Sequence, residues 1–528
     1  MTRFVRKSSG LVREIGAKDA FSMNFSFLGP AAGVAYPLGF AAVLLGSNWL
    51  VATIIGAFIM LPVTFLYYYL STVIPRSGGD YVYISRILGP RIGMIQAIAN
   101  LFVFSVGVPI LAQLELPLVL EPSLQILGVT FHDSGLVSFA QNLSFSNESS
   151  PIFFGLTVVI IAFASMVSML RTKVFASVVT WFTAVQIVGT AVMIVGILSV
   201  RDYASAFNSV SASYGGSTYS SLTEQVGPFD LLQTLVLMSA IASFLYLYNN
   251  APTFFGGEVK SPKRSMFYGQ IVSYVVSAVM AILLVFGLQY VIGEGFYDYT
   301  GVNGWTTSSG NGIPIAPTSL LSYVAIPFLS NPTVIVVMVL SAITWYILYA
   351  ILNVAIPSRT LFSMSFDWLA PSFFSKVSER LRTPVYSVLF VFLAALFFDY
   401  LEIYQGFSVG VLSDIVIYIV YQYFIAAIAA VVLGRKRMYG VDEKLGRKLV
   451  IAGSLSAVCL ALPAILLIGY GVYYAPFGSE IFSGNEVLNL SILVGLPIAA
   501  LAIFESVKRV RMKQGIDISL TFKEIPPE

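Results

Sequence analysis

The strongest constraint on the fold is a series of apolar segments, each about 20 residues or longer, that recurs along the whole chain. An α-helix rises about 1.5 Å per residue, so about 20 apolar residues cross a hydrocarbon layer of about 30 Å. Hydrophobic residues make up 57% of the chain and charged residues 10%, which is outside the range of soluble domains. The sequence therefore predicts an all-α polytopic membrane protein.

Twelve segments of this kind can be drawn, which predicts twelve transmembrane helices. The expected organisation is a tail at 1–19, helices 1–5 at 20–200, a loop at 201–228, helices 6–10 at 229–434, a loop with helices 11 and 12 at 435–507, and a tail at 508–528.

The distribution of basic residues predicts the orientation, because Lys and Arg are retained in cytoplasmic loops. With the N-terminus inside, 28 of the 29 Lys and Arg residues fall in cytoplasmic segments, and Arg201 alone falls outside. One missed span would invert every later loop and destroy this segregation. We therefore expect both termini in the cytoplasm and the protein in the plasma membrane.

Several functional classes are excluded because the sequence lacks the residues or motifs that they need. The basic residues form short clusters between apolar segments, so no nucleic-acid partner is expected. One Cys, Cys459, and one His, His132 in a loop, leave no pattern for a metal site. The chain has no Walker motif, and it has no paired acids on facing helices of the kind a membrane-embedded enzyme needs. No cofactor is expected beyond a coupling proton or sodium ion, and no obligate protein partner is evident.

Two of the predicted helices carry helix-breaking residues in the middle of their spans. Helix 1 contains "FSFLGPAAGVAYPLGF" and helix 6 contains "FLYLYNNAPTFFGG". Pro and Gly free backbone groups that lipid cannot satisfy, so such breaks imply a cavity inside the protein, although simple kinks are an alternative. Helix 6 follows helix 1 by five spans, and interrupted helices at matching positions indicate a transporter built from inverted repeats.

Three loop motifs then carry a family resemblance. They are "PRSGGDYVYISRILGPRIG" between helices 2 and 3, "GGEVKSPKR" after helix 6, and "SRTLFSMSFDWLAPSFFSKVSERLRTPVYS" between helices 8 and 9. In this order and spacing the sequence resembles the amino acid/polyamine/organocation (APC) superfamily of permeases. The resemblance covers roughly residues 10–450.

The resemblance implies a leucine-transporter-type fold, with five-plus-five inverted repeats and two further helices, 11 and 12. It places solute between broken helices 1 and 6, with the carboxylate of an amino acid on helix 1 amides and its amino group on helix 6 carbonyls. Helix dipoles agree with this polarity. The substrate positions carried over are Gly29, Ala31, Ala32, Gly33, Tyr246, Leu247, Tyr248, Asn249 and Asn250, with Phe244 as an aromatic gate.

Ion coupling has separate candidates. Where some proton-coupled relatives carry a Lys in helix 5, this chain has Gln186. Asp414 is the acid placed to bind a proton or a substrate amine, whereas Glu115 lies near the expected outer end of helix 3 and could reach water. Possible neighbours of a sodium site in helix 8 are Thr344, Asn353 and Ser358.

Charged and tyrosine side chains in the first two motifs are candidates for an inner gate, with loop anchoring as the alternative. These residues are Arg76, Asp80, Tyr81, Tyr83, Arg86, Glu258 and Lys260.

The sequence as a whole predicts a secondary permease that takes up amino acids by alternating access, coupled to protons. A polyamine or other organic-cation permease is the alternative, and a membrane-embedded enzyme is the weakest reading. The expected partners are an amino acid or amine substrate and the lipid bilayer.

Overall fold

The computed structural model describes residues 10–525 apart from 40, 42–43, 306–311 and 474–485. Within helices it describes the backbone alone at 36, 408–416, 467–473 and 486–490. The regular structure of the described residues is helical, and two isolated β-bridges join loop segments.

The first part of the chain forms the elements that correspond to predicted helices 1 to 5, together with short helices in the predicted loops. They are α1 (Ala17–Leu28), α2 (Pro30–Leu38), α3 (Trp49–Val73), α4 (Gly79–Ile87), α5 (Pro90–Glu115), the π-helix η2 (Leu116–Leu120), α6 (Glu121–Phe131), α7 (Ser134–Ala140), α8 (Pro151–Met169), α9 (Thr172–Ser199) and α10 (Tyr203–Ser213).

The second half begins with the other interrupted helix. Its elements are α11 (Leu231–Ile241), the π-helix η6 (Ala242–Tyr246), η7 (Ala251–Phe254), α12 (Pro262–Met266), η9 (Phe267–Val272), α13 (Ser273–Gly287), η10 (Leu288–Gly293), α14 (Glu294–Asn303), α15 (Leu320–Ala325), α16 (Pro332–Ala342), α17 (Trp345–Phe366), α18 (Val385–Gln405), α19 (Ser408–Lys436), α20 (Glu443–Tyr473), α22 (Glu486–Lys513) and η14 (Ile518–Phe522).

Eleven helical segments of the described residues are long and apolar enough to cross a bilayer, and each matches one of predicted helices 2 to 12. The segment predicted as helix 1 is instead two short helices, α1 of 12 residues and α2 of 9 residues. Neither is long enough alone to be counted as a span.

The division between α1 and α2 follows from the sequence "LGP". Gly29 adopts a left-handed conformation with φ +48°, which costs glycine little, and its N–H donates to the Phe25 carbonyl at 2.8 Å. Pro30 then opens α2, where its fixed φ suits a first helical position and its missing N–H is not needed. The Gly33 N–H closes the first turn of α2 on the Gly29 carbonyl at 2.7 Å.

The second interruption is longer. The chain leaves α11 through the wide turn of η6, runs without regular helix from 247 to 250, and resumes as the single 3₁₀ turn η7. A third interruption, which the sequence analysis did not predict, separates α16 from α17 at Ile343 and Thr344.

Predicted helix 3 extends beyond its expected end. We placed the end near residue 120, but η2 joins α5 to α6 and gives one segment, Pro90–Phe131. Glu115 consequently lies well inside that segment and is fully buried, which corrects the expectation that it could reach water.

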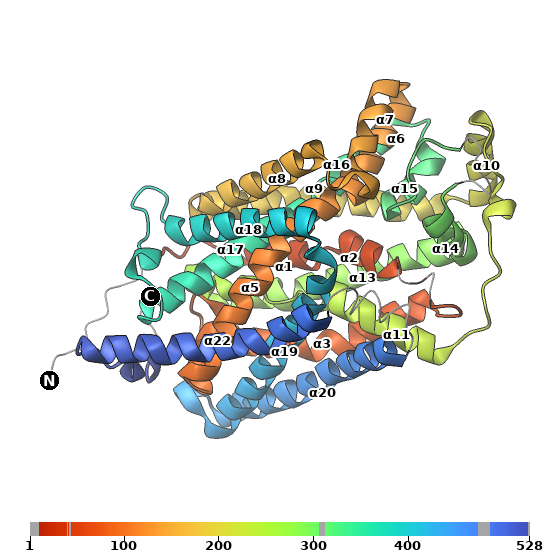
Figure 1. Cartoon of the computed structure of the whole chain (residues 1–528). Helices are drawn as coiled ribbons and strands as arrows, with labels where there is room; N and C mark the ends of the chain where they lie inside the picture. The colour runs from red at the N-terminus through yellow and green to blue at the C-terminus, as the bar shows by residue number, and fades with distance from the viewer. Residues whose placement is uncertain (1–9, 40, 42–43, 306–311, 474–485, 526–528) are drawn as a thin grey trace.

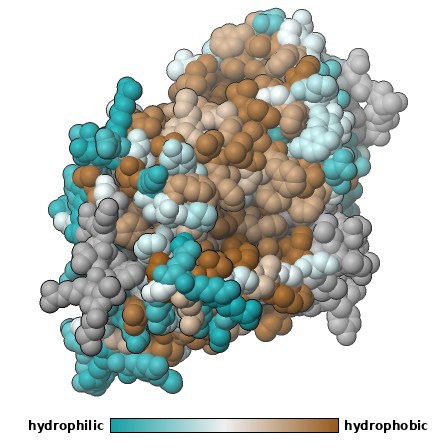
Figure 2. Space-filling model, turned by 60° about the vertical axis from the view of Figure 1, so that its left-hand side comes forward, coloured by the Kyte–Doolittle hydropathy of each residue, from teal (hydrophilic) through white to brown (hydrophobic). Residues whose placement is uncertain are grey.

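Most of the long helices run lengthwise in Figure 1, with α7, α10 and α14 on the right and the segments around 10–16 and 518–525 on the left. We call the left end the terminal end. In Figure 2 a broad hydrophobic band separates hydrophilic side chains at the two edges of the face shown. Large apolar side chains such as Phe58, Trp181 and Val458 are about 70% exposed. This surface fits a lipid environment and would be unfavourable in water.

Candidate functional site

A cavity of about 80 Å³ lies where the two interrupted helices meet. It is lined by Ala32, Gly33, Val103, Gly107, Ile110, Leu111, Leu114, Phe244, Tyr248, Tyr346, Tyr349, Asn353 and Ile419. About 10–15 Å³ of such volume holds one water molecule, so the cavity has room for several waters or a small solute. Among the described residues, none that lines it is charged.

One wall of the cavity is the start of α2. Ala32 and Gly33 line it, and Ala31 and Ala32 belong to the first helical turn, whose N–H groups have no acceptor within their own helix. The N-terminus of a helix also carries partial positive charge. This wall therefore offers two backbone donors and a favourable potential to a small anion such as a carboxylate.

Tyr349 of α17 holds the break between α1 and α2 in place. Its hydroxyl donates to the carbonyl of Leu28, the last residue of α1, at 2.7 Å. The ring lies so close that a Cβ added at Gly29 would be 2.6 Å from Tyr349 Cε2. The break thus needs glycine both for its φ angle and for the space the tyrosine occupies.

Aromatic rings form the apolar part of the cavity wall. The Tyr248 ring makes edge-to-face contacts with Phe27 at 5.3 Å and with Tyr349 at 6.2 Å between ring centroids. Phe244 of η6 and Tyr346 of α17 also line the space. Rings in these arrangements are rigid and give a cavity a definite shape.

The side chain of Asn249 is part of a hydrogen-bond network that joins four helices. Its Nδ2 donates to Thr64 at 2.5 Å, and its Oδ1 accepts from Nδ2 of Asn24 at 2.5 Å. Asn24 also donates to Ser273 at 2.9 Å. Asn249 is fully buried and does not line the cavity, so its side chain ties the break of the second helix to α1, α3 and α13.

Asn250 ties the same break to α4. Its Nδ2 donates to Oδ2 of Asp80 at 3.2 Å, and the Tyr67 hydroxyl donates to the same oxygen at 3.2 Å. Burial raises the pKa of Asp80 to about 7, although the hydrogen bonds from Tyr67 and Asn250 oppose that rise. This carboxyl group therefore titrates near neutral pH.

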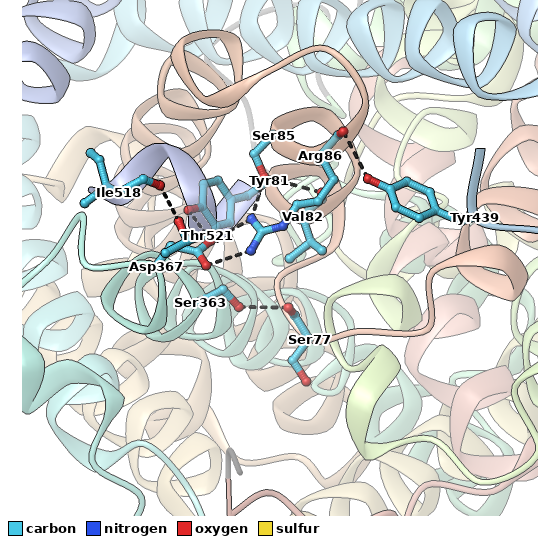
Figure 3. Close-up of polar contacts among 10 residues, drawn as sticks. All are labelled: Ser77, Tyr81, Val82, Ser85, Arg86, Ser363, Asp367, Tyr439, Ile518 and Thr521. Atoms are coloured by element: carbon cyan, nitrogen blue, oxygen red, sulfur yellow. Dashed lines mark hydrogen bonds and ion pairs between the residues drawn. The ribbon is translucent and has the colours of Figure 1, made fainter. Parts of the chain in front are cut away.

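A buried ion pair joins α4 to the end of α17 (Figure 3). Arg86 donates through both terminal nitrogens to Asp367, at 2.6 Å each, and the Tyr81 hydroxyl donates to Asp367 at 2.7 Å. The side chains of Arg86 and Asp367 are at most 1% exposed. A bidentate pair of this kind fixes the orientation of both partners.

The C-terminal segment covers this ion pair. The ring of Phe522 in η14 lies 5.0 Å from the Arg86 guanidinium, at cation–π distance, and Ile518 of the same turn is fully buried. Arg511 of α22 donates to the carbonyl of Trp368, the residue after Asp367, at 3.2 Å.

A second buried ion pair lies beside the segment that follows η7. The Arg359 Nε donates to Glu258 at 3.3 Å, the Thr172 hydroxyl donates to Glu258 at 2.6 Å, and both ionic side chains are fully buried. The guanidinium of Arg359 also lies 4.8 Å from the Phe255 ring. This pair joins α17, α9 and the end of the second interrupted helix.

The N-terminal segment is attached at the same place. The N–H groups of Glu14 and Ile15 donate to the Glu258 carbonyl at 2.9 and 3.0 Å, and the Lys260 N–H donates to the Ile15 carbonyl at 2.8 Å. The described N-terminal and C-terminal segments are therefore both packed against the loops at the terminal end.

A comparison with protein-family models matches residues 15–498 to the family described as amino acid permease. The match covers most of the chain. The chain belongs to the amino acid permease family. The resemblance inferred from the three loop motifs is thereby confirmed, and the hydrophobic helices of the permease are those of a multi-pass membrane protein.

A protein of Sulfolobus islandicus rod-shaped virus 1, named Uncharacterized protein 399, is similar to the permease over nearly its full length. The two are 24% identical over 486 residues, which is 89% of this chain and 96% of the viral protein. Its name assigns no activity, so this similarity gives no information on the substrate.

The structure divides the predicted substrate positions of the permease into two groups. Ala32, Gly33, Phe244 and Tyr248 line the cavity. The other positions lie at the breaks without lining it, either in the backbone at the start of α2 or buried against neighbouring helices; they are Gly29, Ala31, Tyr246, Leu247, Asn249 and Asn250.

The inner-gate candidates are also divided. Asp80, Tyr81, Arg86 and Glu258 take part in the buried networks described above, whereas Lys260 is exposed on its side chain and bonds through its backbone. Arg76 is half-buried and donates to the Pro75 carbonyl at 3.1 Å, and Tyr83 is fully buried.

Sequence reasoning missed two partners in these networks, Arg359 and Asp367. Both lie in the third loop motif, "SRTLFSMSFDWLAP", which identified the family but was assigned no gate residues. The signal in the sequence was that this motif contains one Arg and one Asp among residues that are otherwise mainly small or apolar.

The coupling candidates fall in different places. Asp414 belongs to α19, but its side chain lies outside the described residues. Gln186 is fully buried, and its side-chain nitrogen and oxygen have no hydrogen-bond partner among the described residues.

The three possible sodium neighbours do not converge on one site. Thr344 donates to the Ser341 carbonyl, Asn353 to the Tyr349 carbonyl and Ser358 to the Ala355 carbonyl, all on the same stretch of chain. Fourteen residues separate the first from the last, which is about 21 Å along a helix.

Proposed function

We propose that this permease is a secondary active transporter that moves amino acids across a membrane by alternating access. The observation that carries the proposal is the cavity between the two interrupted helices, which combines the first turn of α2 with an aromatic wall. In lipid, unwound backbone is tolerated only where protein, water or ligand takes up its hydrogen bonds. A solute with its own donors and acceptors would take up hydrogen bonds of the backbone at both breaks.

The polarity of the breaks favours a zwitterion. The start of α2 presents N–H groups and partial positive charge to a carboxylate. The segment 247–250 leaves a helix at its C-terminal end, where carbonyl groups lack helical partners and favour an ammonium group. An α-amino acid carries both groups on one carbon atom and can meet both ends at once.

The cavity lining favours an uncharged substrate side chain. Leu111, Leu114, Ile110 and the aromatic rings supply apolar contacts, and Asn353 supplies one amide. A polyamine has several cationic groups and would need carboxylates to replace its lost hydration. The lining described here has none, so we favour neutral amino acids over polyamines and other organic cations.

For the architecture we propose twelve spans, with α1 and α2 together forming the first. The two repeats would then be helices 1–5 and 6–10, related by inversion, with helices 11 and 12 outside them. The spacing of five spans between the breaks supports this arrangement. An even number of spans also agrees with the packing of both terminal segments at one end.

We further propose that the terminal end is cytoplasmic and that the transporter lies in the plasma membrane. The charge segregation of the loops supports this orientation. The ion pairs Arg86–Asp367 and Glu258–Arg359 would then close the inner side, and they would have to separate before solute could leave toward the cytoplasm.

The test is uptake of labelled amino acids into proteoliposomes that contain the purified protein and no ATP. We expect neutral amino acids to compete with one another, to accumulate against their gradient, and to respond to an imposed proton gradient. Inhibition by polyamines alone would support the organic-cation alternative, and equilibration without accumulation would indicate a facilitator. Chemical conversion of the solute would indicate an enzyme, and no response to any amino acid or amine would refute the proposal.

A further inference from the structure

A buried carboxylate next to the cavity has no role in the site described above. Glu115 lies at the end of α5, immediately before the wide turn of η2, and its side chain is fully buried. Its Oε2 accepts a hydrogen bond from the backbone N–H of Tyr346 at 3.2 Å. Its Oε1 has no hydrogen-bond partner among the described residues.

The Glu115 carboxylate faces the N-terminus of α17. Tyr346 is the second residue of that helix, and the helix begins at a break in the middle of a longer apolar segment, Pro332–Phe366. Helix α17 is 22 residues long, so partial positive charge at its start stabilises an anion. In the part of the chain that the structure describes, this helix end is what stabilises the ionised carboxylate, and it stabilises an anion less than a salt bridge does.

Among the described residues, the ion pairs of the permease involve other acids, and none includes Glu115. The elements packed against α5 and η2 carry acids and phenols, which include Tyr346 and Tyr349 of α17, Asp399 and Glu402 of α18, Tyr418, Tyr421 and Tyr423 of α19, and Glu121 of α6. Asp399 and Glu402 both accept hydrogen bonds from Gln113 of α5. The basic residues of α17 and α19 lie elsewhere: Arg359 pairs with Glu258, and Arg435 and Lys436 are exposed in the last turn of α19.

Two features of these surroundings act on Glu115 in opposite directions. Burial favours the protonated form, whereas the helix end and its N–H donor favour the ionised form. A carboxyl group subject to both changes protonation when one of them changes, which is what an ion-coupling site requires.

The same contact reaches the cavity. Leu114, which precedes Glu115, lines the cavity. Tyr346, whose backbone N–H donates to the Glu115 carboxylate, lines it as well. One turn further along α17, Tyr349 also lines the cavity and donates to the Leu28 carbonyl at the first break. A shift in the first turn of α17 would therefore move two cavity walls and the group that satisfies the break.

We propose that Glu115 is the proton-binding group of the permease and couples proton binding to the shape of the cavity through α17. A proton from solvent in the cavity forms an O–H bond on Oε1, and the carboxyl group becomes neutral. It then holds the start of α17 less tightly, because its attraction to the helix dipole is lost. The break at Ile343 and Thr344 allows the first turn of α17 to move, and deprotonation toward the other side restores the contact.

This inference rests on the proposed transport function, so the experiment measures two activities. The first is exchange of labelled amino acid across proteoliposomes at equal pH, which needs substrate binding and alternating access but no net proton movement. The second is accumulation driven by a pH gradient. The variant is Glu115→Gln, which keeps an acceptor oxygen for the Tyr346 N–H but cannot titrate.

We expect Glu115→Gln to retain exchange within about threefold and to lose pH-driven accumulation, and Glu115→Asp to recover part of that accumulation. Exchange by the variant should also lose its dependence on pH. The matched control is Glu121→Gln, a buried acid of α6 that accepts a hydrogen bond from Gln125 of the same helix. This variant should keep both activities.

Either of two results would overturn the assignment. Persistent pH-driven accumulation by Glu115→Gln would show that the proton binds elsewhere. Loss of exchange as well as accumulation would show that Glu115 serves packing or substrate binding, since Gln preserves the contact to α17. Absence of exchange in the wild-type protein would instead count against the transport function itself, so the two failures are distinguishable.

Discussion

At the scale of single residues, the site depends on a glycine and a tyrosine that are 320 positions apart. The sequence predicted a break at Gly29 because Gly-Pro cannot continue a helix, and the structure places the break there. It could not predict that Tyr349 satisfies the freed Leu28 carbonyl, because that contact exists only after α17 packs on α1. Local conformation was readable from the sequence, and the long-range partner was not.

Substitution of Gly29 by Ala should therefore impair transport. The left-handed backbone at Gly29 costs other residues about 1–2 kcal/mol, and the added Cβ would meet the Tyr349 ring. Since about 1.4 kcal/mol corresponds to a factor of ten, we expect amino acid exchange to fall about tenfold or more. The control is Gly155→Ala in α8, where an added Cβ has no neighbour within 4 Å. Equal activity of the two variants would argue against a constrained break.

Asp80 gives a prediction about pH and stability. In an unfolded chain its pKa has the ordinary value of 3.8, and burial raises it to about 7 in the folded protein. The folded state therefore binds this proton more tightly, so its contribution to stability is complete below about pH 4 and is lost as pH rises to about 7.

The substitution Asp80→Asn removes this titration. The wild-type protein should lose stability between about pH 5 and about pH 8, and the variant should not lose this part. The difference in free energy of unfolding between variant and wild type should therefore shift in favour of the variant by on the order of 2–3 kcal/mol over this range. Thermal unfolding in detergent at both pH values measures the difference. A stability difference that does not vary with pH would show that Asp80 is not titrating in the folded protein.

At the scale of elements, the helices were more predictable than their junctions. Apolar length located the spans, and eleven of them are present as expected. The π-helical turn η2 and the break between α16 and α17 were not predicted, because neither changes the apolar pattern of the sequence. These two features bury Glu115 at a helix end, which is why its sequence position near the expected end of helix 3 was misleading.

The sequence motifs contained the residues of the two buried ion pairs but did not show which residues pair. Glu258 and Arg86 were predicted as gate residues, but their partners Arg359 and Asp367 lie 101 and 281 positions away. The motif order showed that these loops belong to one family pattern. Which side chains pair depends on the packing of α4, α9 and α17.

Removing one member of the buried pair should destabilise the permease strongly. Glu258→Gln leaves the Arg359 guanidinium buried without a counter-charge, which costs about 3–5 kcal/mol. The control is Glu443→Gln, because Glu443 pairs with Arg447 at the surface and both side chains are more than half exposed, so about 0–1 kcal/mol is expected. Thermal unfolding of the three proteins in detergent tests this, and equal destabilisation of the two variants would contradict it.

At the scale of the whole molecule, the hydrophobic band and the position of the cavity support a transport function. The band in Figure 2 fixes the bundle across a membrane, and the cavity lies between the two interrupted helices. The sequence predicted this general arrangement from apolar length, loop charge and paired breaks. It did not predict which of the pocket positions face the cavity, because side-chain direction at an unwound segment has no regular period.

The most direct test of the central claim is a block of the cavity itself. Gly107 lines the cavity, and Gly107→Phe would place a ring in the space proposed for the substrate. Gly155→Phe, at an exposed position of α8, adds the same ring where an added Cβ has no neighbour within 4 Å. Exchange of labelled neutral amino acid in proteoliposomes is measured for both variants and for the wild-type protein. We predict that Gly107→Phe abolishes exchange and Gly155→Phe preserves it; full exchange by Gly107→Phe would contradict a substrate site between the two broken helices.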